Sequence, residues 1–208
     1  MRKLINLLAL ALTPITTVIA DAPGTPFAIP RVSNPPMLDG RCRDDEWDQA
    51  NAIRLPADVT LGVMYYRESL YVCASGKAQD YTALDLYIQH EETGQLHNLH
   101  ISAQLGERTS SYGEWSELVF WELRDWTAFW VPYAGTEESD TGSRPDFLEG
   151  SDREVRVLRS KFPGTNWRMM IVVSAVIRGE TPWTELYYPE GADDADPSTW
   201  KTFAFEDR

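Results

Sequence analysis

Short runs of alternating apolar and polar residues follow one another along the chain from Met37 onward, separated by turn residues. The clearest runs are Val59–Tyr65, Leu70–Ala74, Leu84–Ile88, Ala128–Val131, Arg153–Leu158, Trp167–Ile177 and Trp200–Phe205. A period of two is typical of strands with one buried face. Only Asp44–Ala50 has the spacing of a helical turn. The pattern predicts an all-β protein, an antiparallel β-sandwich of jelly-roll or immunoglobulin-like type with one short helical turn.

The amino-terminal residues differ from the rest of the chain. Arg2 and Lys3 precede an apolar run from Leu4 to Leu12, and small residues end at Ala20, as in a signal peptide cleaved before Asp21. The run is too short for a bilayer core, which needs about 20 apolar residues. We therefore expect residues 1–20 to be removed and the protein to be periplasmic or secreted, with no membrane span.

The remaining chain divides into a lead-in and one folded unit. Residues 21–36 carry the prolines Pro23, Pro26, Pro30, Pro35 and Pro36, which predicts an extended lead-in. Residues 37–208 form the predicted sandwich. Within it, Gly135–Asp152 is rich in Gly, Ser and acidic residues, and we expect a long surface loop there.

One hairpin can be worked out in detail. A two-residue turn at Thr93-Gly94 would pair Ile88 with Leu99 and Leu86 with Ile101. This register places one almost wholly apolar face toward the core: Leu84, Leu86, Ile88 and His90 against His97, Leu99, Ile101 and Ala103. The other face then carries Asp85, Tyr87 and Gln89 against Asn98, His100 and Ser102, with Gln104 just beyond.

The polar face and the tryptophans supply the candidate binding residues. Sugars present hydroxyls to amides and carboxylates, and C–H faces to flat rings. The chain has 8 tryptophans, of which Trp115 and Trp126 have polar neighbours and are expected to be exposed, whereas Trp121 and Trp130 are expected in the core. The predicted ligand-binding residues are Tyr87, Gln89, Asn98, His100, Gln104, Trp115 and Trp126. A solvated strand face with no ligand is the simpler alternative.

Charge and cysteine content narrow the partners. The chain has 19 basic and 32 acidic residues, a net charge of −13, which disfavours nucleic acid and other polyanions because a cationic surface is needed to displace their counterions. Neutral ligands remain. Cys42 and Cys73 are the 2 cysteines, and in an oxidising compartment we expect them to form a disulfide.

Several motifs resemble those of the family-9 carbohydrate-binding modules and the related DOMON-like domains. They are Met37-Leu-Asp-Gly40, Asp45-Glu-Trp-Asp-Gln-Ala50, Leu70-Tyr-Val72, Asp85-Leu-Tyr-Ile88, Trp167-Arg-Met-Met170 and the closing Trp200. The resemblance covers most of residues 36–205. It departs after Trp167, where the family commonly has Glu and then Ile-Pro. It implies a sugar-recognising β-sandwich, often attached to a glycoside hydrolase and in some members binding calcium. No gripping tryptophan can be assigned from it.

Other chemistries have weaker support in the sequence. The sequence contains no nucleophile elbow, phosphate loop or HExxH, and no pair of glycosidase carboxylates can be singled out, so an enzyme is not expected. His90 and His97 would face each other on the apolar side, where a buried, mutually hydrogen-bonded pair is expected rather than a metal site. A haem-binding electron-transfer domain using Met169 or Met170 is an alternative, although core packing is the usual role of such residues. The acidic run Asp193–Asp196 does not fit an EF-hand.

The sequence thus predicts a secreted or periplasmic, non-catalytic protein that binds a neutral oligo- or polysaccharide by aromatic stacking and amide hydrogen bonds. No cofactor is expected, and calcium cannot be assigned to particular residues. A partner glycoside hydrolase is expected from the family resemblance. A haem- or metal-binding domain and a protein-interaction module are the alternatives.

Overall fold

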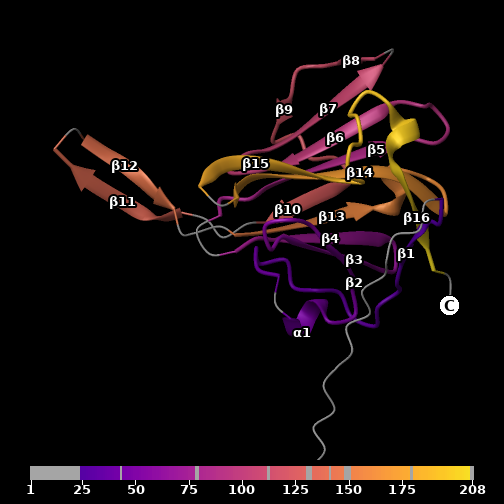
Figure 1. Cartoon of the computed structure of the whole chain (residues 1–208), viewed down its shortest axis with the longest axis horizontal. Helices are drawn as coiled ribbons and strands as arrows, with labels where there is room; N and C mark the ends of the chain where they lie inside the picture. The colour runs from indigo at the N-terminus through magenta and orange to yellow at the C-terminus, as the bar shows by residue number, and fades with distance from the viewer. Residues whose placement is uncertain are drawn as a thin grey trace, which may run out of the picture.

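Two mainly antiparallel sheets make up most of the computed structural model, which describes residues 24–42, 44–77, 80–111, 113–129, 133–140, 142–147, 151–178 and 180–206 (Figure 1). The larger, nine-stranded sheet contains β1 (Phe27–Ile29), β16 (Lys201–Phe205), β14 (Asn166–Arg178), β5 (Ala83–Gln89), β6 (Leu96–Ile101), β7 (Leu105–Ser111) and β8 (Glu114–Trp115) in this order, with β15 (Thr181–Tyr188) beside β14 and β9 (Val119–Phe120) beside β7. The smaller sheet has the order β10 (Trp126–Phe129), β13 (Asp152–Leu158), β4 (Ser69–Ser75), β3 (Thr60–Tyr66) and β2 (Asn51–Arg54).

The remaining elements are few. The helix α1 spans Asp44–Trp47, and short 3-10 turns span Arg159–Lys161 and Pro197–Thr199. Strand pairs are antiparallel except β1–β16, which is parallel. The predicted all-β sandwich with one helical turn is confirmed. The runs predicted as strands correspond to β3, β4, β5, β13, β14 and β16, and the first two residues of the run Ala128–Val131 lie in β10, while residues 130–131 lie outside the described residues.

The core lies between the inner faces of the two sheets. Leu84, Leu86 and Ile88 of β5 are completely buried there, together with Leu99 and Ile101 of β6. The smaller sheet contributes Leu61, Val63, Val72, Ala74, Val155 and Val157 to the same cluster. Each large aliphatic side chain buried in this way contributes about 1.5–3 kcal/mol to folding. The sandwich therefore depends on the alternation that is visible in the sequence.

The β5–β6 hairpin has the predicted faces but a different register. Leu86 pairs with Leu99 and Ile88 with His97, a shift of two residues from the predicted pairing. The hydrogen bonds His90 N–Gln95 O (2.8 Å) and Gly94 N–His90 O (2.8 Å) close a four-residue connection in place of the two-residue turn. Because side chains alternate with period two, an even shift leaves every residue on its predicted face. It does bring Leu96, and not an amide, opposite Gln89.

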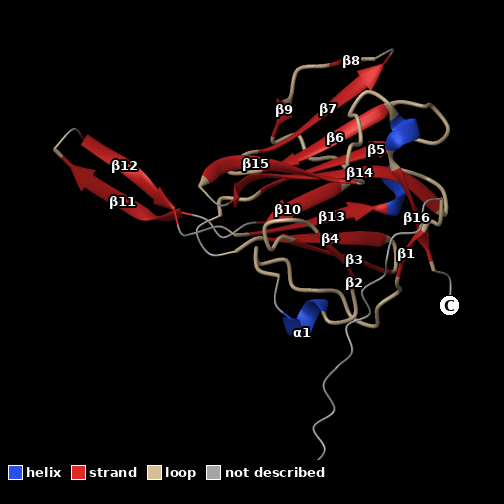
Figure 2. Cartoon of the chain, viewed as in Figure 1, coloured by secondary structure: helices blue, strands red, loops and turns tan. Residues whose placement is uncertain are grey.

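The expectation of a loop over Gly135–Asp152 is wrong for the part that the structure describes. Residues Tyr133–Ser139 (β11) and Gly142–Phe147 (β12) pair as an antiparallel hairpin, which stands away from the sandwich at the left of Figure 2. The paired backbones satisfy their own hydrogen-bonding groups, and the Gly-, Ser- and acid-rich sequence shows no apolar alternation that would indicate strands. Gly142, with φ of +124°, adopts a conformation that other residues rarely allow.

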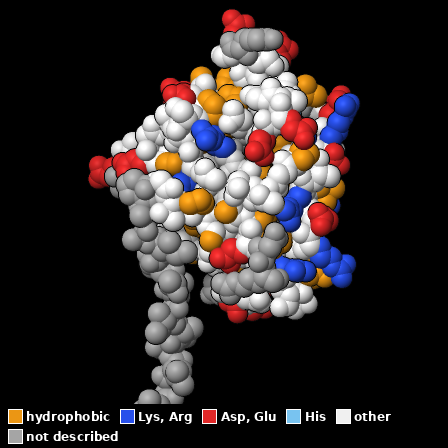
Figure 3. Space-filling view, turned by 90° about the vertical axis from the view of Figure 1, so that its right-hand side faces the viewer, with side chains coloured by type: hydrophobic (Ala, Val, Ile, Leu, Met, Phe, Trp, Pro, Cys, Tyr) orange, Lys and Arg blue, Asp and Glu red, His pale blue; other side chains and the backbone are white. Residues whose placement is uncertain are grey.

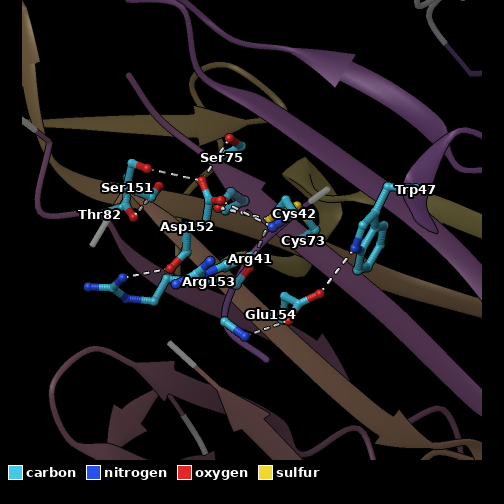
Figure 4. Close-up of a disulfide and its surroundings, with 12 residues drawn as sticks. Arg41, Cys42, Trp47, Cys73, Ser75, Thr82, Ser151, Asp152, Arg153 and Glu154 are labelled. Carbon is cyan, nitrogen blue, oxygen red and sulfur yellow. Dashed lines mark hydrogen bonds between the residues drawn. A yellow bond between two sulfur atoms is a disulfide. The ribbon is translucent and has the colours of Figure 1, made fainter. Parts of the chain in front are cut away.

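The helical turn is fixed to the outer side of the smaller sheet by one carboxylate (Figure 4). Glu154, which is fully buried, accepts hydrogen bonds from the backbone N–H groups of Asp39 (2.9 Å) and Gly40 (2.8 Å) and from Trp47 Nε1 (3.0 Å). The Trp47 ring lies against Gly62, where a Cβ would meet it at 3.0 Å. Cys42 and Cys73 form the predicted disulfide beside this cluster. The Asp-Gly and Glu-Trp motifs therefore have a structural role.

Replacing Glu154 by Ala should lower the free energy of unfolding by about 3 kcal/mol, because three donors, two of them in buried hydrogen bonds, lose their acceptor. Glu154→Gln should cost less, about 1–2 kcal/mol, because one acceptor oxygen remains. The control is Glu122→Ala at an exposed surface pair with Arg124 (3.8 Å), expected to change stability by less than about 0.5 kcal/mol. Urea denaturation measures all three. Equal stability of the two Glu154 variants and the control would contradict this role.

Candidate functional site

The outer face of the larger sheet, which points away from the smaller sheet, carries the candidate site. Strand pairing places six residues in one row across this face: Tyr187 of β15, Val172 of β14, Asp85 of β5, His100 of β6, Gly106 of β7 and Phe120 of β9. Directly paired residues in a sheet point to the same side. The row therefore brings together groups from six strands.

A hollow of about 370 Å³ opens at the β15 end of this row. It is lined by Asp85, Tyr87, Val172, Ser174, Glu185, Tyr187, Ala192, Asp193 and Asp194. We call it the acidic hollow because four of these residues are carboxylic acids. Tyr187 is 37% exposed and Tyr87 is 8% exposed. The hollow thus offers one open ring and several hydrogen-bond acceptors.

The C-terminal segment builds the wall of the acidic hollow. Trp200 packs edge-on against Tyr87, with ring centroids 6.1 Å apart, and its Nε1 donates to Asp193 O at 2.6 Å. Asp193 N donates in turn to Thr199 Oγ1 at 3.0 Å. Trp200 is 6% exposed and belongs to a second hydrophobic cluster on the outer face. The segment that carries Asp193 and Asp194 is held against the sheet by this tryptophan.

A hydrogen-bond network occupies the middle of the outer face. Asn98 donates from Nδ2 to Asp85 Oδ1 (3.0 Å) and accepts from Arg108 Nε (2.9 Å), while Arg108 also donates to the Tyr87 hydroxyl (3.2 Å). The Arg108 guanidinium lies over the Trp115 ring, 4.9 Å from its centroid. Burial, reinforced by the Asp85 charge, raises the pKa of Tyr87 to about 12. Asn98, at 2% exposure, has both ends of its amide engaged within the protein.

The His100 ring is held from both sides. Its Nδ1 lies 2.9 Å from Asp85 Oδ1, and its Nε2 lies 2.9 Å from Ser102 Oγ. Ser102 stands in the short turn between β6 and β7 and is half-buried. The structure therefore aligns a hydroxyl, an imidazole and a carboxylate in series.

The predicted binding residues are only partly brought together. Tyr87, Asn98, His100 and the half-buried Trp115 lie on the outer face, whereas Gln89 lies at the far end of β5, opposite Leu96. Gln104 is exposed in the turn beside Ser102. The predicted platform is not an open flat surface, because Trp115 and Trp200 cover Tyr87. Their roles in binding remain a prediction.

Two expectations about tryptophans are wrong. Trp126 is 4% exposed in the main core, where its Nε1 donates to Glu107 Oε2 at 3.0 Å. The inward-facing Glu107 thus satisfies the indole N–H of Trp126 in the core, which the polar residues beside Trp126 in the sequence do not indicate. Trp121, expected in the core, is 61% exposed with φ of +66°, just beyond the end of the short strand β9. Trp130 lies outside the described residues.

His90 and His97 do face each other on the inner side, with ring centroids 6.4 Å apart. The expected mutual hydrogen bond is replaced, because His97 Nδ1 lies 2.8 Å from Glu107 Oε1, which also accepts from Lys161 Nζ at 3.0 Å. Burial acts to raise the pKa of Glu107, but these two donors outweigh it and lower the pKa. Among the residues described, no group of three His, Cys, Asp or Glu side chains is placed to hold a metal ion.

Sequence reasoning missed Glu185, Tyr187, Asp193 and Asp194 as parts of the site. Glu185-Leu-Tyr-Tyr188 alternates after Gly179-Glu180, a signal for a further hairpin strand. The positions of Asp193 and Asp194 depend on how the chain between β15 and β16 folds back over the sheet. No local pattern indicates that arrangement.

Comparison with known proteins supports the fold. No protein-family model matches the sequence, and no curated protein matches it significantly. A solved structure of a proposed carbohydrate-binding protein from Bacteroides uniformis is similar, with a TM-score of 0.56 and 10% sequence identity, covering 86% of this chain and 98% of that one. At this identity the likeness establishes a shared fold. It does not distinguish family-9 or DOMON-like modules from other sandwiches.

Within the described ranges, no helix is long and apolar enough to span a membrane.

The two tyrosines of the acidic hollow, Tyr87 and Tyr187, should ionise only at high pH. A hydrogen bond from its hydroxyl to Glu185 Oε2 (2.6 Å), followed by burial, raises the pKa of Tyr187 to about 12, as burial does for Tyr87. Each raised pKa favours the neutral phenol in the folded state, so its contribution to stability is complete below the ordinary pKa of 10.0 and is lost as pH rises through about 12. Absorbance titration at the phenolate band should show a late component that Tyr87→Phe and Tyr187→Phe each reduce. Identical curves for the variants and the unmodified protein would contradict it.

Proposed function

We propose that this protein binds a neutral carbohydrate in the acidic hollow on the outer face of the larger sheet. The observation that carries the proposal is the lining of the hollow, which combines the exposed Tyr187 ring with the carboxylates of Asp85, Glu185, Asp193 and Asp194. A sugar offers an apolar C–H face to such a ring and donates its hydroxyls to carboxylates. Strand β5 supplies Asp85 and strand β15 supplies Glu185 and Tyr187, and both strands are hydrogen-bonded to β14 between them.

Charge supports a neutral ligand over an anionic one. The net charge of the whole chain is −13, and four acids line the hollow itself. On the side of the molecule seen in Figure 3, basic side chains are separated by acidic and neutral ones and make no continuous cationic surface. Polyanions would be repelled under these conditions. The shared fold with a proposed carbohydrate-binding protein agrees with this reading.

The secreted or periplasmic location and the glycoside hydrolase partner belong to the same proposal. The Cys42–Cys73 disulfide is compatible with an oxidising compartment. The haem alternative receives less support, because Met169 and Met170 are both fully buried in hydrophobic clusters. Binding a glycan does not itself require a bond to be broken, in keeping with the expectation of a binding protein.

A second, larger recess could compete for the ligand. It has a volume of about 570 Å³ and runs between the edge strands β2 and β15, with Arg54 and Leu55 on one side and Leu186 and Tyr187 on the other. We favour the acidic hollow because four carboxylic acids line it, whereas apolar residues make up most of the lining of the larger recess. Glu185 and Tyr187 border both recesses, so the variants that distinguish them are at Asp194, which lines only the acidic hollow, and at Arg54, which lines only the larger recess.

Titration calorimetry of the purified protein against neutral cello-, xylo- and manno-oligosaccharides tests the proposal. Tyr187→Ala and Asp194→Asn should each weaken binding about tenfold, the value of one stacking contact or one hydrogen bond to a charged group. The matched control is Arg54→Ala, which borders only the recess between β2 and β15 and should leave affinity unchanged. Absence of heat with every neutral glycan overturns the proposal. Loss of binding in Arg54→Ala but not in Asp194→Asn would move the site to the other recess.

A further inference from the structure

We propose that Ser102, His100 and Asp85 form a nucleophilic triad that hydrolyses acyl esters. The choice of substrate, an ester on a carbohydrate hydroxyl, rests on the proposed function. The triad itself does not, because it follows from the geometry of these three side chains. The inference adds an activity that the sequence did not lead us to expect.

The three groups stand in the order that acyl transfer requires. Ser102 Oγ lies 2.9 Å from His100 Nε2, and His100 Nδ1 lies 2.9 Å from Asp85 Oδ1. A serine is activated when an imidazole can take its proton and a carboxylate holds that imidazole in the right tautomer. Both distances are within the range for such hydrogen bonds. The sequence does not indicate a catalytic serine at position 102, because it lacks the nucleophile-elbow motif of other serine hydrolases.

The base and the carboxylate are held rigidly. His100 and Asp85 are directly paired across β6 and β5, near the centre of the larger sheet. Asp85 Oδ1 also accepts from Asn98 Nδ2 at 3.0 Å, and Asn98 is fixed by Arg108. The His100 side chain is 26% exposed and the Asp85 side chain 15% exposed. The imidazole is therefore oriented by the protein while one edge of it stays accessible.

The nucleophile stands where a substrate can approach. Ser102 is half-buried in the turn that joins β6 to β7, next to the exposed Gln104. Gln104 N donates to Ser102 Oγ at 3.1 Å, and Gln104 O accepts from the same hydroxyl at 3.1 Å. The hydroxyl can thus rotate its proton between His100 and Gln104 O. The Gln104 N–H stabilises the partial negative charge that Ser102 Oγ gains as its proton passes to His100.

The surroundings of the triad suit a carbohydrate ester. In the row across the outer face, His100 lies between the acidic hollow, reached through Asp85, and an apolar wall on the β9 side. Gly106 lies opposite His100. Leu118 and Phe120 pack so closely over it that a Cβ at this position would lie about 3 Å from their side chains. The backbone N–H of Trp121, just after β9, donates to Leu105 O (2.9 Å) and so fixes this segment against β7. A sugar in the hollow would direct a small acyl group toward that wall.

The reaction balances with water as the only co-reactant. Ser102 Oγ attacks the ester carbonyl carbon as its proton passes to His100 Nε2. The bond to the sugar oxygen then breaks, and His100 returns the proton to that oxygen, which leaves an acyl-serine. Water, deprotonated by His100, hydrolyses the acyl-serine to a carboxylic acid and free Ser102. Asp85 remains anionic and accepts the Nδ1–H bond throughout.

Two assays on the full-length protein test the triad. Hydrolysis of 4-nitrophenyl acetate should fall at least about 100-fold in Ser102→Ala and in His100→Gln, since general base catalysis contributes that much or more. A fluorophosphonate probe should label the peptide that contains Ser102, and Asp85→Asn should slow the labelling. Ser143→Ala, at an exposed serine on the β11–β12 hairpin, is the control and should leave both unchanged. Thermal melting checks that each variant is folded.

Turnover that persists in folded Ser102→Ala, or a label on another residue, overturns the proposal. Release of acetate from O-acetylated xylan tests the substrate class, and its failure despite Ser102-dependent turnover of the aryl ester rejects the sugar-ester part alone. Calorimetric binding of unacylated glycans by the unmutated protein reports on the proposed function separately. Binding without labelling or turnover leaves that function intact and removes the triad.

Discussion

The contact between the aliphatic inner faces of the two sheets determines the rest of the structure. Leu84, Leu86 and Ile88 can be buried on one side of β5 only if Asp85 and Tyr87 point to the other. That requirement sends Asp85 to the same face as His100, its cross-strand partner. The polar groups of the candidate site are thus on the outer face because the core takes the alternate positions. An odd shift in register would exchange the two faces and remove both the core and the site.

The outer face is divided between structure and function. Its middle is filled by the bonds among Asp85, Asn98, Arg108 and Tyr87 and is covered by Trp115 and Trp200. Buried polar groups need such partners, because each one left unpaired costs about 1–3 kcal/mol. The same network fixes Asp85, which borders the acidic hollow on one side and orients His100 on the other. A structural network therefore sets the geometry of both proposed activities.

Much of the fold could be predicted from alternation alone, and the reasons for the failures are physical. The faces of β5 and β6 were predicted correctly although the register was off by two residues. A shift by an even number of residues leaves each side chain on the same face of the sheet. The hairpin β11–β12 was missed because its sequence, rich in Gly, Ser and acidic residues, has no apolar alternation. Trp126 was misassigned because its polar partner, Glu107, is distant in sequence. The strands and their buried faces could be predicted because they depend on the local alternation of apolar and polar residues.

The candidate site was less predictable. Tyr87, Asn98 and His100 were placed on the correct face, but the covering of that face by Trp200 depends on a chain reversal far along the sequence. The series Ser102–His100–Asp85 required a turn geometry that places Ser102 within 2.9 Å of the imidazole. Alternation puts residues on a face and gives no distance between side-chain atoms. Sites assembled from several strands therefore need coordinates.

The most direct test of the central claim, that this face is the functional surface, is chemical-shift mapping by NMR. Isotope-labelled protein would be titrated with the neutral oligosaccharide that gives the largest heat in calorimetry. The account predicts shifts concentrated in β5, β14, β15 and residues 192–194, with His100 among the affected side chains. Shifts centred on the smaller sheet, or on β2 and residues 54–56, would contradict it.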